Sequence, residues 1–136
     1  MPPKKSKLKI YSGSSHPALA KEIAKALKVK LSEMDIQRFA NGEIYAKPMD
    51  TVRGCDVYVI QSASRNVNED MMELFVMLDS FKRSFARSIH VVLPSYPYAR
   101  QDRVATPREP ISAKLMADLI SAAGATHVIT LSLHSG

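Results

Sequence analysis

Short apolar runs alternate with longer amphipathic stretches along this chain. The apolar and alternating runs are bounded by turn residues and predict strands at residues 8–12, 35–39, 43–47, 56–61, 89–93 and 127–133. Between them, apolar side chains recur every three or four positions, which is the period of a helix with one apolar face. Such stripes follow Pro17, occupy residues 68–84, and begin again at Ile111.

Strands that alternate with helices are typical of a parallel sheet covered on both faces. We therefore predict one α/β domain with a parallel sheet of about five strands and helices on both sides. Asn41-Gly42 lies between two extended segments, which is a strong hairpin signal. Residues 39–47 should thus form a small hairpin or flap, and ligand loops should gather at the carboxyl ends of the parallel strands.

All three predicted helices have a recognisable apolar face. The stripe on the longest helix is rich in methionine and phenylalanine and consists of Met71, Phe75, Leu78, Phe81 and Phe85. Such a stripe is typical of a core or of a subunit contact. The last helix is marked by apolar residues at positions 111, 115 and 119, and Gly124 stands where a C-terminal cap is expected.

The charge of the chain suggests anionic partners. The formal net charge is +6, which suits nucleic acid, anionic membranes or phosphorylated small molecules. Part of this charge lies at the N-terminus, and we expect residues 1–7 to form a basic, disordered tail. Aromatic residues are not interleaved with these lysines, so nucleic-acid binding is not favoured. No apolar run resembles a membrane span or a signal peptide, so we expect a cytoplasmic protein without membrane contact.

Several common chemistries have no motif in this sequence. Cys55 is the only cysteine, which excludes an internal disulfide and a cysteine metal cluster. Its place at the start of a strand favours a packing role, with a reactive thiol as the alternative. Neither a Walker loop nor a dinucleotide-binding glycine motif occurs, and there is no nucleophile elbow.

The long polar loop at residues 95–110 is a candidate site. Arginine side chains are planar, permanently charged forks that match phosphate oxygens, and Arg100 and Arg103 provide two of them. Gln101 could bind a base or ribose, and Asp102 could hold an arginine or a metal ion. The alternative is a solvated basic loop with internal ion pairs.

A second candidate cluster lies in the predicted hairpin. Phe39 could stack on a purine, while Asn41 and Glu43 contact its polar edge. An ordinary hairpin with a core phenylalanine is the alternative. His134 follows the last strand and could be a ligand or a structural histidine, and His16 by the first turn allows the same two interpretations.

Four segments occur in the order seen in ribose-phosphate pyrophosphokinases. They are residues 11–17 (YSGSSHP), 38–43 (RFANGE), 97–103 (PYARQDR) and 110–115 (PISAKL). Their shared order argues against a chance match. From about Leu8 to its last residue, the chain therefore resembles the N-terminal, ATP-binding half of this enzyme family.

The resemblance implies a phosphoribosyltransferase-like fold for residues 8–136. It also implies a diphosphokinase of nucleotide biosynthesis. Such enzymes transfer the pyrophosphoryl group of MgATP to ribose 5-phosphate, which gives phosphoribosyl pyrophosphate and AMP. Adenine would be held by Phe39, Asn41 and Glu43 of one subunit. Arg100 and Gln101 would come from the other subunit of a homo-oligomer, and family members form hexamers.

The resemblance also implies a metal site and a regulatory site. His134 matches the histidine that helps to bind the Mg²⁺ of MgATP. Thr51 and Arg53 lie near the positions that take part in a phosphate- and ADP-regulated site. Two departures stand beside these matches, since Ala105 and Ser132 occupy places where relatives often have aspartate. They keep a non-catalytic, associated regulatory subunit open as the alternative function.

The sequence stops just past an apolar strand, so we expect a truncated chain that lacks the C-terminal domain. In the family that domain carries the flexible catalytic loop and the ribose-phosphate loop. We therefore assign no catalytic residue in this chain, and we expect the isolated fragment to be inactive.

Overall fold

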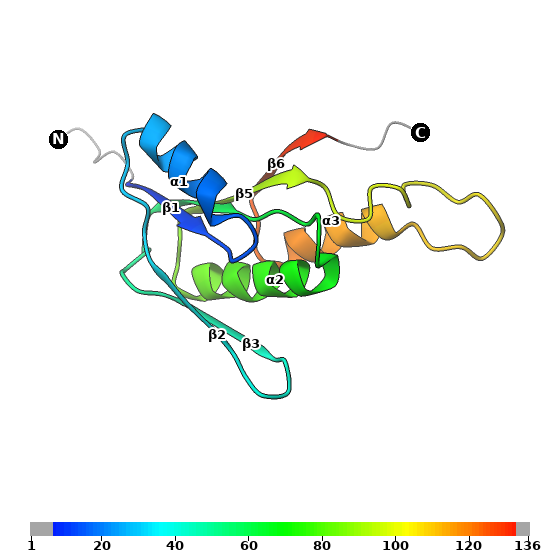
Figure 1. The fold of residues 1–136 in the computed structure, drawn as a ribbon, viewed down its shortest axis with the longest axis horizontal. Coiled ribbons are helices and arrows are strands. Elements are labelled where there is room, and N and C mark those ends of the chain that lie inside the picture. The colour runs from blue at the N-terminus through cyan, green and yellow to red at the C-terminus, as the bar shows by residue number, and fades with distance from the viewer. Residues whose placement is uncertain (1–6, 133–136) are drawn as a thin grey trace.

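A computed structural model describes residues 7–132 (Figure 1). The elements run in the order β1 Leu8–Ser12, α1 Pro17–Ala26, β2 Met34–Arg38, β3 Ile44–Pro48, β4 Asp56–Ile60, α2 Val67–Arg83, β5 Ser88–Ser95, α3 Ser112–Ala123 and β6 His127–Ser132. The predicted alternation of strands and helices is confirmed. Residues 1–6 of the predicted tail and His134 lie outside the described residues.

The main sheet has four strands in the order β1-β4-β5-β6, and every pairing in it is parallel. The predicted fold class is confirmed, with four strands in the parallel sheet where about five were expected. Leu31 makes a single parallel bridge to Ile10 on the outer side of β1. This contact lies where a further strand would add to the sheet, but it is one residue long.

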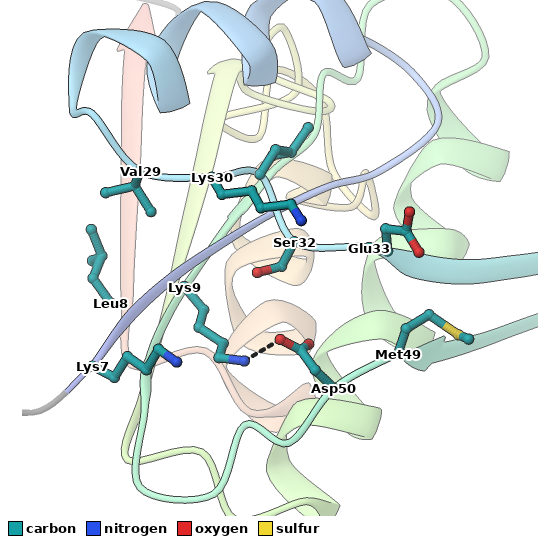
Figure 2. A pocket seen from close by; sticks show the side chains of 10 residues that line it. Lys7, Leu8, Lys9, Val29, Lys30, Ser32, Glu33, Met49 and Asp50 are labelled. Carbon is teal, nitrogen blue, oxygen red and sulfur yellow. Dashed lines mark hydrogen bonds and ion pairs between the residues drawn. The ribbon is translucent and has the colours of Figure 1, made fainter.

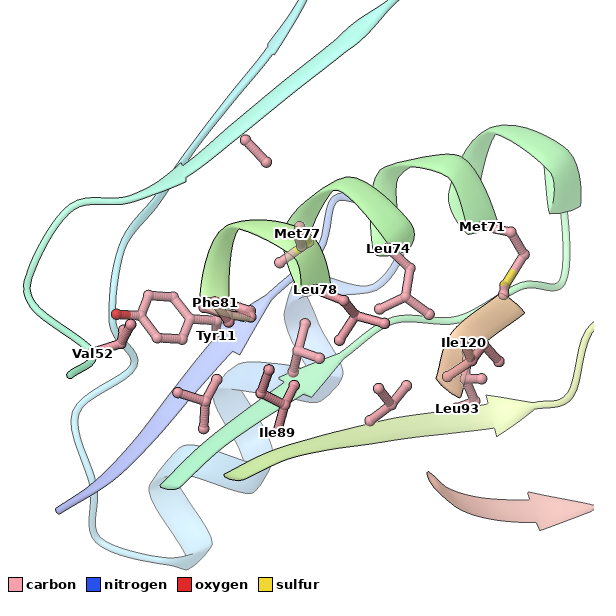
Figure 3. Close-up of a cluster of buried hydrophobic side chains, with 14 of the residues drawn as sticks. Tyr11, Val52, Met71, Leu74, Met77, Leu78, Phe81, Ile89, Leu93 and Ile120 are labelled. Atoms are coloured by element: carbon pink, nitrogen blue, oxygen red, sulfur yellow. The ribbon is translucent and has the colours of Figure 1, made fainter. Parts of the chain in front are cut away.

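Helices cover both faces of the sheet, as predicted (Figure 1). Successive strand residues point to opposite faces, so Ile10 and Ile60 pack against Ala20 and Ala24 of α1. The other face packs against α2 and α3 in the larger core cluster (Figure 3). Its sheet residues include Tyr11, Val57, Val59, Ile89, Val91 and Leu93.

Only part of the apolar face predicted for α2 is buried in the core. Met71, Leu78 and Phe81 of α2 are buried, but Phe85 is 65% exposed. It misses the core because α2 ends at Arg83 and Phe85 has a left-handed backbone with φ of 63°.

The face that α3 buries differs from the apolar face by which the sequence predicted this helix. Ser112, Met116 and Ile120 face the core. The stripe at 111, 115 and 119 is exposed instead. Two apolar stripes of helical period lie side by side in this sequence, and only one of them can face the sheet.

The predicted hairpin is present. β2 and β3 pair antiparallel, from Met34 opposite Pro48 to Arg38 opposite Ile44. Ala46 joins the larger core cluster, and the hairpin extends beyond α2 away from the main sheet (Figure 1). The hairpin tip is therefore presented outside the body of the domain.

A row of stacked rings crosses the sheet on the α1 face. The Tyr58 and His90 rings have centroids 4.4 Å apart, and His90 and His127 are 5.0 Å apart and nearly parallel. The Ser88 hydroxyl lies 2.9 Å from His90 Nε2. Burial, followed by the neighbouring His127, lowers the pKa of His90.

The first helix begins as its sequence suggests. Pro17 occupies the first turn, where a missing N–H costs nothing. His16 is the N-cap, and its Nδ1 accepts a hydrogen bond from the Leu19 N–H at 3.3 Å. The described helices include none with the length and apolar character needed to cross a bilayer.

Candidate functional site

The hairpin tip holds its polar side chains in a fixed arrangement. The Glu43 N–H donates to Asn41 Oδ1 at 3.0 Å, and the Asn41 amide donates back to the Glu43 carboxylate. The Phe39 N–H donates to the Glu43 carbonyl at 2.8 Å. Gly42 closes the turn with φ of 93°, a conformation that suits glycine.

Phe39 is 52% exposed at this tip. The alternative of a core phenylalanine is therefore wrong. An exposed aromatic ring beside a locked amide and carboxylate is a suitable surface for a flat, polar-edged ring, because stacking and edge hydrogen bonds can act together.

The second predicted cluster lies on the loop between β5 and α3. Arg100 and Gln101 are both exposed. Gln101 is anchored at three points: its N–H donates to the Tyr98 carbonyl at 2.9 Å, its carbonyl accepts from the Ala113 N–H at 3.0 Å, and its Oε1 accepts from the Ser112 hydroxyl at 2.8 Å. The start of the loop is thus fixed on the first turn of α3.

This loop encloses a pocket of about 430 Å³. Arg100, Gln101 and Arg103 line it together with Glu109. The Glu109 carboxylate accepts hydrogen bonds from two backbone N–H groups of the loop, at 3.1 and 3.2 Å. The hydrogen bond from the Thr106 side chain, followed by these backbone bonds, lowers the pKa of Glu109. The Arg100 and Arg103 side chains therefore line a pocket whose loop is held in shape by its own hydrogen bonds.

The first turn of α2 contacts both predicted clusters. Arg38, next to the hairpin tip, forms an ion pair with Glu69 at 3.3 Å. Tyr98, next to Arg100, donates a hydrogen bond to Asn68. Beyond these anchor points the hairpin tip and the loop extend in different directions (Figure 1). Within one chain, Phe39 and Arg100 are not brought together over one ligand.

The predicted regulatory residues lie elsewhere, on the connection between β3 and β4. Thr51 and Arg53 are exposed, and the Arg53 guanidinium lies 5.0 Å from the centre of the Phe85 ring. The Gly54 N–H donates to the Phe85 carbonyl at 3.0 Å. The connection is therefore attached to the segment that follows α2.

A polar cavity that was not predicted lies at the carboxyl ends of β1 and β4. It has a volume of about 620 Å³, and Arg38, Arg65 and Asp70 are among its lining residues. Burial, followed by the neighbouring Glu73, raises the pKa of Asp70. Ligands of open α/β sheets bind at this edge.

A buried carboxylate forms the floor of this cavity. Glu73 is 3% exposed, and it accepts hydrogen bonds from the Ser14 N–H and hydroxyl at 2.7 and 2.6 Å and from the Gln61 amide at 2.6 Å. Glu73 stands four residues before buried Met77 on α2. A charge at an apolar position of a helix is the one signal that could have revealed this network.

The described residues contain no group of three or more histidine, cysteine, aspartate or glutamate side chains that could hold a metal ion. The predicted metal ligand His134 lies outside the described part. Asp102 Oδ1, in the Arg100 loop, is buried without a hydrogen-bond partner among the described residues. Oxygen atoms of this kind suit Mg²⁺, which binds through one or two carboxylates plus substrate phosphates.

The structure is an α/β domain whose parallel sheet has helices on both faces. Its projecting hairpin and its arginine-bearing loop are features suited to a phosphorylated ligand. Residues 8–124 match the model of the N-terminal domain of ribose phosphate pyrophosphokinase. The chain belongs to this family, which confirms the resemblance seen in the sequence.

Known relatives extend this match. The chain is 52% identical over 128 residues to a ribose-phosphate pyrophosphokinase of Clostridium perfringens and equally to one of Bacillus subtilis, covering 94% of this chain and 40% of each relative. The crystal structure of phosphoribosylpyrophosphate synthetase from Mycobacterium smegmatis matches with a TM-score of 0.93 and 44% identity, over 96% of this chain and 44% of that one. The chain thus spans about two fifths of the length of these relatives.

Proposed function

We propose that this chain is the ATP-binding half of a ribose-phosphate pyrophosphokinase. In the proposed reaction, the anomeric oxygen of ribose 5-phosphate bonds to the β-phosphorus of ATP. The bond from that phosphorus to the oxygen it shares with the α-phosphorus breaks, the anomeric hydroxyl loses its proton, and AMP leaves. The exposed Phe39 ring beside the locked Asn41–Glu43 pair is the observation that carries this proposal.

The hairpin tip would bind adenine. Phe39 would stack on the ring, the Glu43 carboxylate would accept from the exocyclic amino group, and the Asn41 amide would donate to a ring nitrogen. The hydrogen bonds between Asn41 and Glu43 support this role because they orient both side chains before a ligand arrives. Pre-oriented groups lose less entropy when they bind.

The Arg100 loop would bind the phosphates of ATP and come from a second subunit. Pyrophosphoryl transfer depends mainly on positioning and on neutralising charge, and the Arg100 and Arg103 forks at one pocket support that role. Bound with ATP, Mg²⁺ would neutralise further phosphate charge. His134 and Asp102 are the candidates in this chain to face it.

A homo-oligomer would bring the hairpin tip of one subunit to the Arg100 loop of another. The exposed apolar stripe of α3, formed by Ile111, Leu115 and Leu119, supports such assembly because exposed apolar patches mark interfaces.

Thr51 and Arg53 would contribute to a regulatory phosphate site, and their exposure on an anchored connection supports access by an anion. The named relatives are pyrophosphokinases, which supports a catalytic protein over a non-catalytic subunit.

Phe39→Ala in the full-length enzyme tests the adenine site. Loss of a base–aromatic stack costs about 1–3 kcal/mol, so the KM for ATP should rise roughly 5- to 150-fold. The KM for ribose 5-phosphate should change little. Steady-state kinetics with each substrate varied in turn would measure both values.

Tyr45→Ala is the matched control, because Tyr45 is an aromatic residue on the same hairpin that is 38% exposed and lies outside the tip. It should leave the KM for ATP near that of the parent enzyme. An unchanged KM for ATP in Phe39→Ala, or an equal rise in both variants, would remove Phe39 from the adenine site.

A further inference from the structure

A second cavity lies at the opposite end of β1 from the ligand loops (Figure 2). Its volume is about 420 Å³, and it lies between the start of β1, the segment after α1 and the end of β3. Leu8, Val29 and Met49 contribute apolar wall, while three lysines and Ser32 contribute polar wall. The cavity therefore has both a cationic and an apolar part.

The lysines of this cavity come from two segments of the chain. Lys7 lies just before β1, and Lys9 is near the start of that strand. Lys30 comes from the segment after α1. In Figure 2 all three side chains extend toward the side where Ser32 and Asp50 lie. Three ammonium groups thus share one side of the cavity.

Lys9 is the buried member of this group. Its side chain is 8% exposed and pairs with Asp50, whose other oxygen accepts from the Tyr11 hydroxyl at 2.5 Å. Burial alone would raise the pKa of Asp50, but the hydrogen bonds from Lys9 and Tyr11 outweigh it, and the pKa is lowered. An ammonium has three donors, and Asp50 accepts from one of the three on Lys9.

The charges of the cavity do not balance. Lys7, Lys9 and Lys30 face two carboxylates, Asp50 and Glu33, which leaves one positive charge in excess. Both Asp50 oxygens already accept a hydrogen bond. Lys9 is paired with Asp50, so the excess positive charge comes from the exposed Lys7 and Lys30. A cavity lined by an excess of one sign of charge attracts the opposite ion, here an anion.

We propose that this cavity binds a tetrahedral phosphate-type oxyanion, at a site separate from the proposed nucleotide site. Lys7, Lys9 and Lys30 would donate to it from one side of the cavity, as lysines do when they act as point charges for phosphate. The Ser32 hydroxyl would add a fourth donor. The apolar wall would accept the organic part of a phosphate monoester, and inorganic phosphate would use the lysines alone.

Titration of the chain with inorganic phosphate and with phenyl phosphate, at constant ionic strength, tests this site. The amide NMR signals of residues 8, 30 and 32 should shift and saturate with each ligand. Tighter binding of phenyl phosphate would identify organic monoesters as the natural source, and equal affinity would identify free phosphate. Absence of saturating shifts with both ligands would overturn the proposal.

Exchange of the two exposed lysines provides the decisive variant. The double change Lys7→Met and Lys30→Met leaves the buried ion pair intact, and it should weaken binding about tenfold. Lys21→Met, an exposed lysine on α1 outside the cavity, should leave the affinity unchanged. Equal affinity in the double variant and the parent chain would refute the site.

Arg53→Ala separates this proposal from the proposed regulatory site. Anion binding to the lysine cavity should survive this change. Loss of the shifts in Arg53→Ala, with affinity preserved in the double lysine variant, would place the anion on the Thr51–Arg53 connection and overturn the lysine site. Neither result depends on catalytic turnover, so the proposed enzyme function stands or falls separately.

Discussion

Among the glycines of residues 7–132, Gly13 is the one at which an added methyl group would meet the closest neighbouring atoms. It follows β1, and a Cβ at this position would lie 2.1 Å from Gln61 Oε1 and 2.5 Å from its Cδ. Gln61 is completely buried. Its Oε1 accepts from the Ser15 N–H and hydroxyl at 3.2 and 2.5 Å, and its amide donates to Glu73 and to the Asp70 carbonyl at 2.6 and 3.1 Å.

Gly13→Ala should therefore lower the free energy of unfolding by about 2–7 kcal/mol. Overpacking a well-packed core costs about 1–3 kcal/mol. Displacing the Gln61 amide should also break two or three hydrogen bonds, each worth about 0.5–1.5 kcal/mol. The flexible side chain cannot simply turn away, because every polar atom of its amide already has a partner.

Urea unfolding followed by far-UV circular dichroism suits this measurement, since the chain has no tryptophan. Gly42→Ala is the control: nothing lies within 4 Å of its added Cβ, so only backbone strain of about 1–2 kcal/mol should appear. Gly13→Ala should cost at least about 1 kcal/mol less in a Gln61→Ala background. An equal loss in both backgrounds would refute the contact.

Three further outcomes are expected. Leu78→Ala should destabilise by about 2–5 kcal/mol in urea unfolding, whereas Met72→Ala, 53% exposed on the same helix, should change stability by under about 1 kcal/mol. The lowered pKa of His90 means that the unfolded chain binds more protons. Stability should therefore fall as the pH drops below about 6.5, and less so in a His90→Phe variant. In the full-length enzyme, Arg100→Ala should raise the KM for ATP about ten- to a hundredfold, while Arg108→Ala on the same exposed loop should not.

The parts of this fold that could be predicted are those set by neighbours in sequence. The Asn41-Gly42 turn and the start of α1 at Pro17 depend on local backbone preferences, and both are as expected. The apolar period likewise located every helix and strand among residues 7–132. Local chemistry was sufficient for these features because turn residues and the apolar period are properties of neighbouring residues.

Features that depend on distant contacts could not be predicted. Leu115 and Met116 are adjacent apolar residues of α3, and only the packing of the helix decides that Met116 faces the core. The exposure of Phe39 depends on how far the hairpin extends from the body. Glu73 is buried because Ser14 and Gln61 reach it from other elements. The sequence near Glu73 shows only a charge at an apolar helix position and does not identify these two partners.

The pairing of β1 with β4 also has a consequence for the order of folding. Leu8 pairs with Asp56, so the β2–β3 hairpin lies entirely within the loop that this pairing closes. The hairpin joins nearby residues and can form within about 1–10 μs. Before two parallel strands can pair, the chain must lose the conformational entropy of closing the long loop between them. We expect the hairpin to form early and the parallel sheet to assemble later, at the slower rates of folds built on non-local contacts.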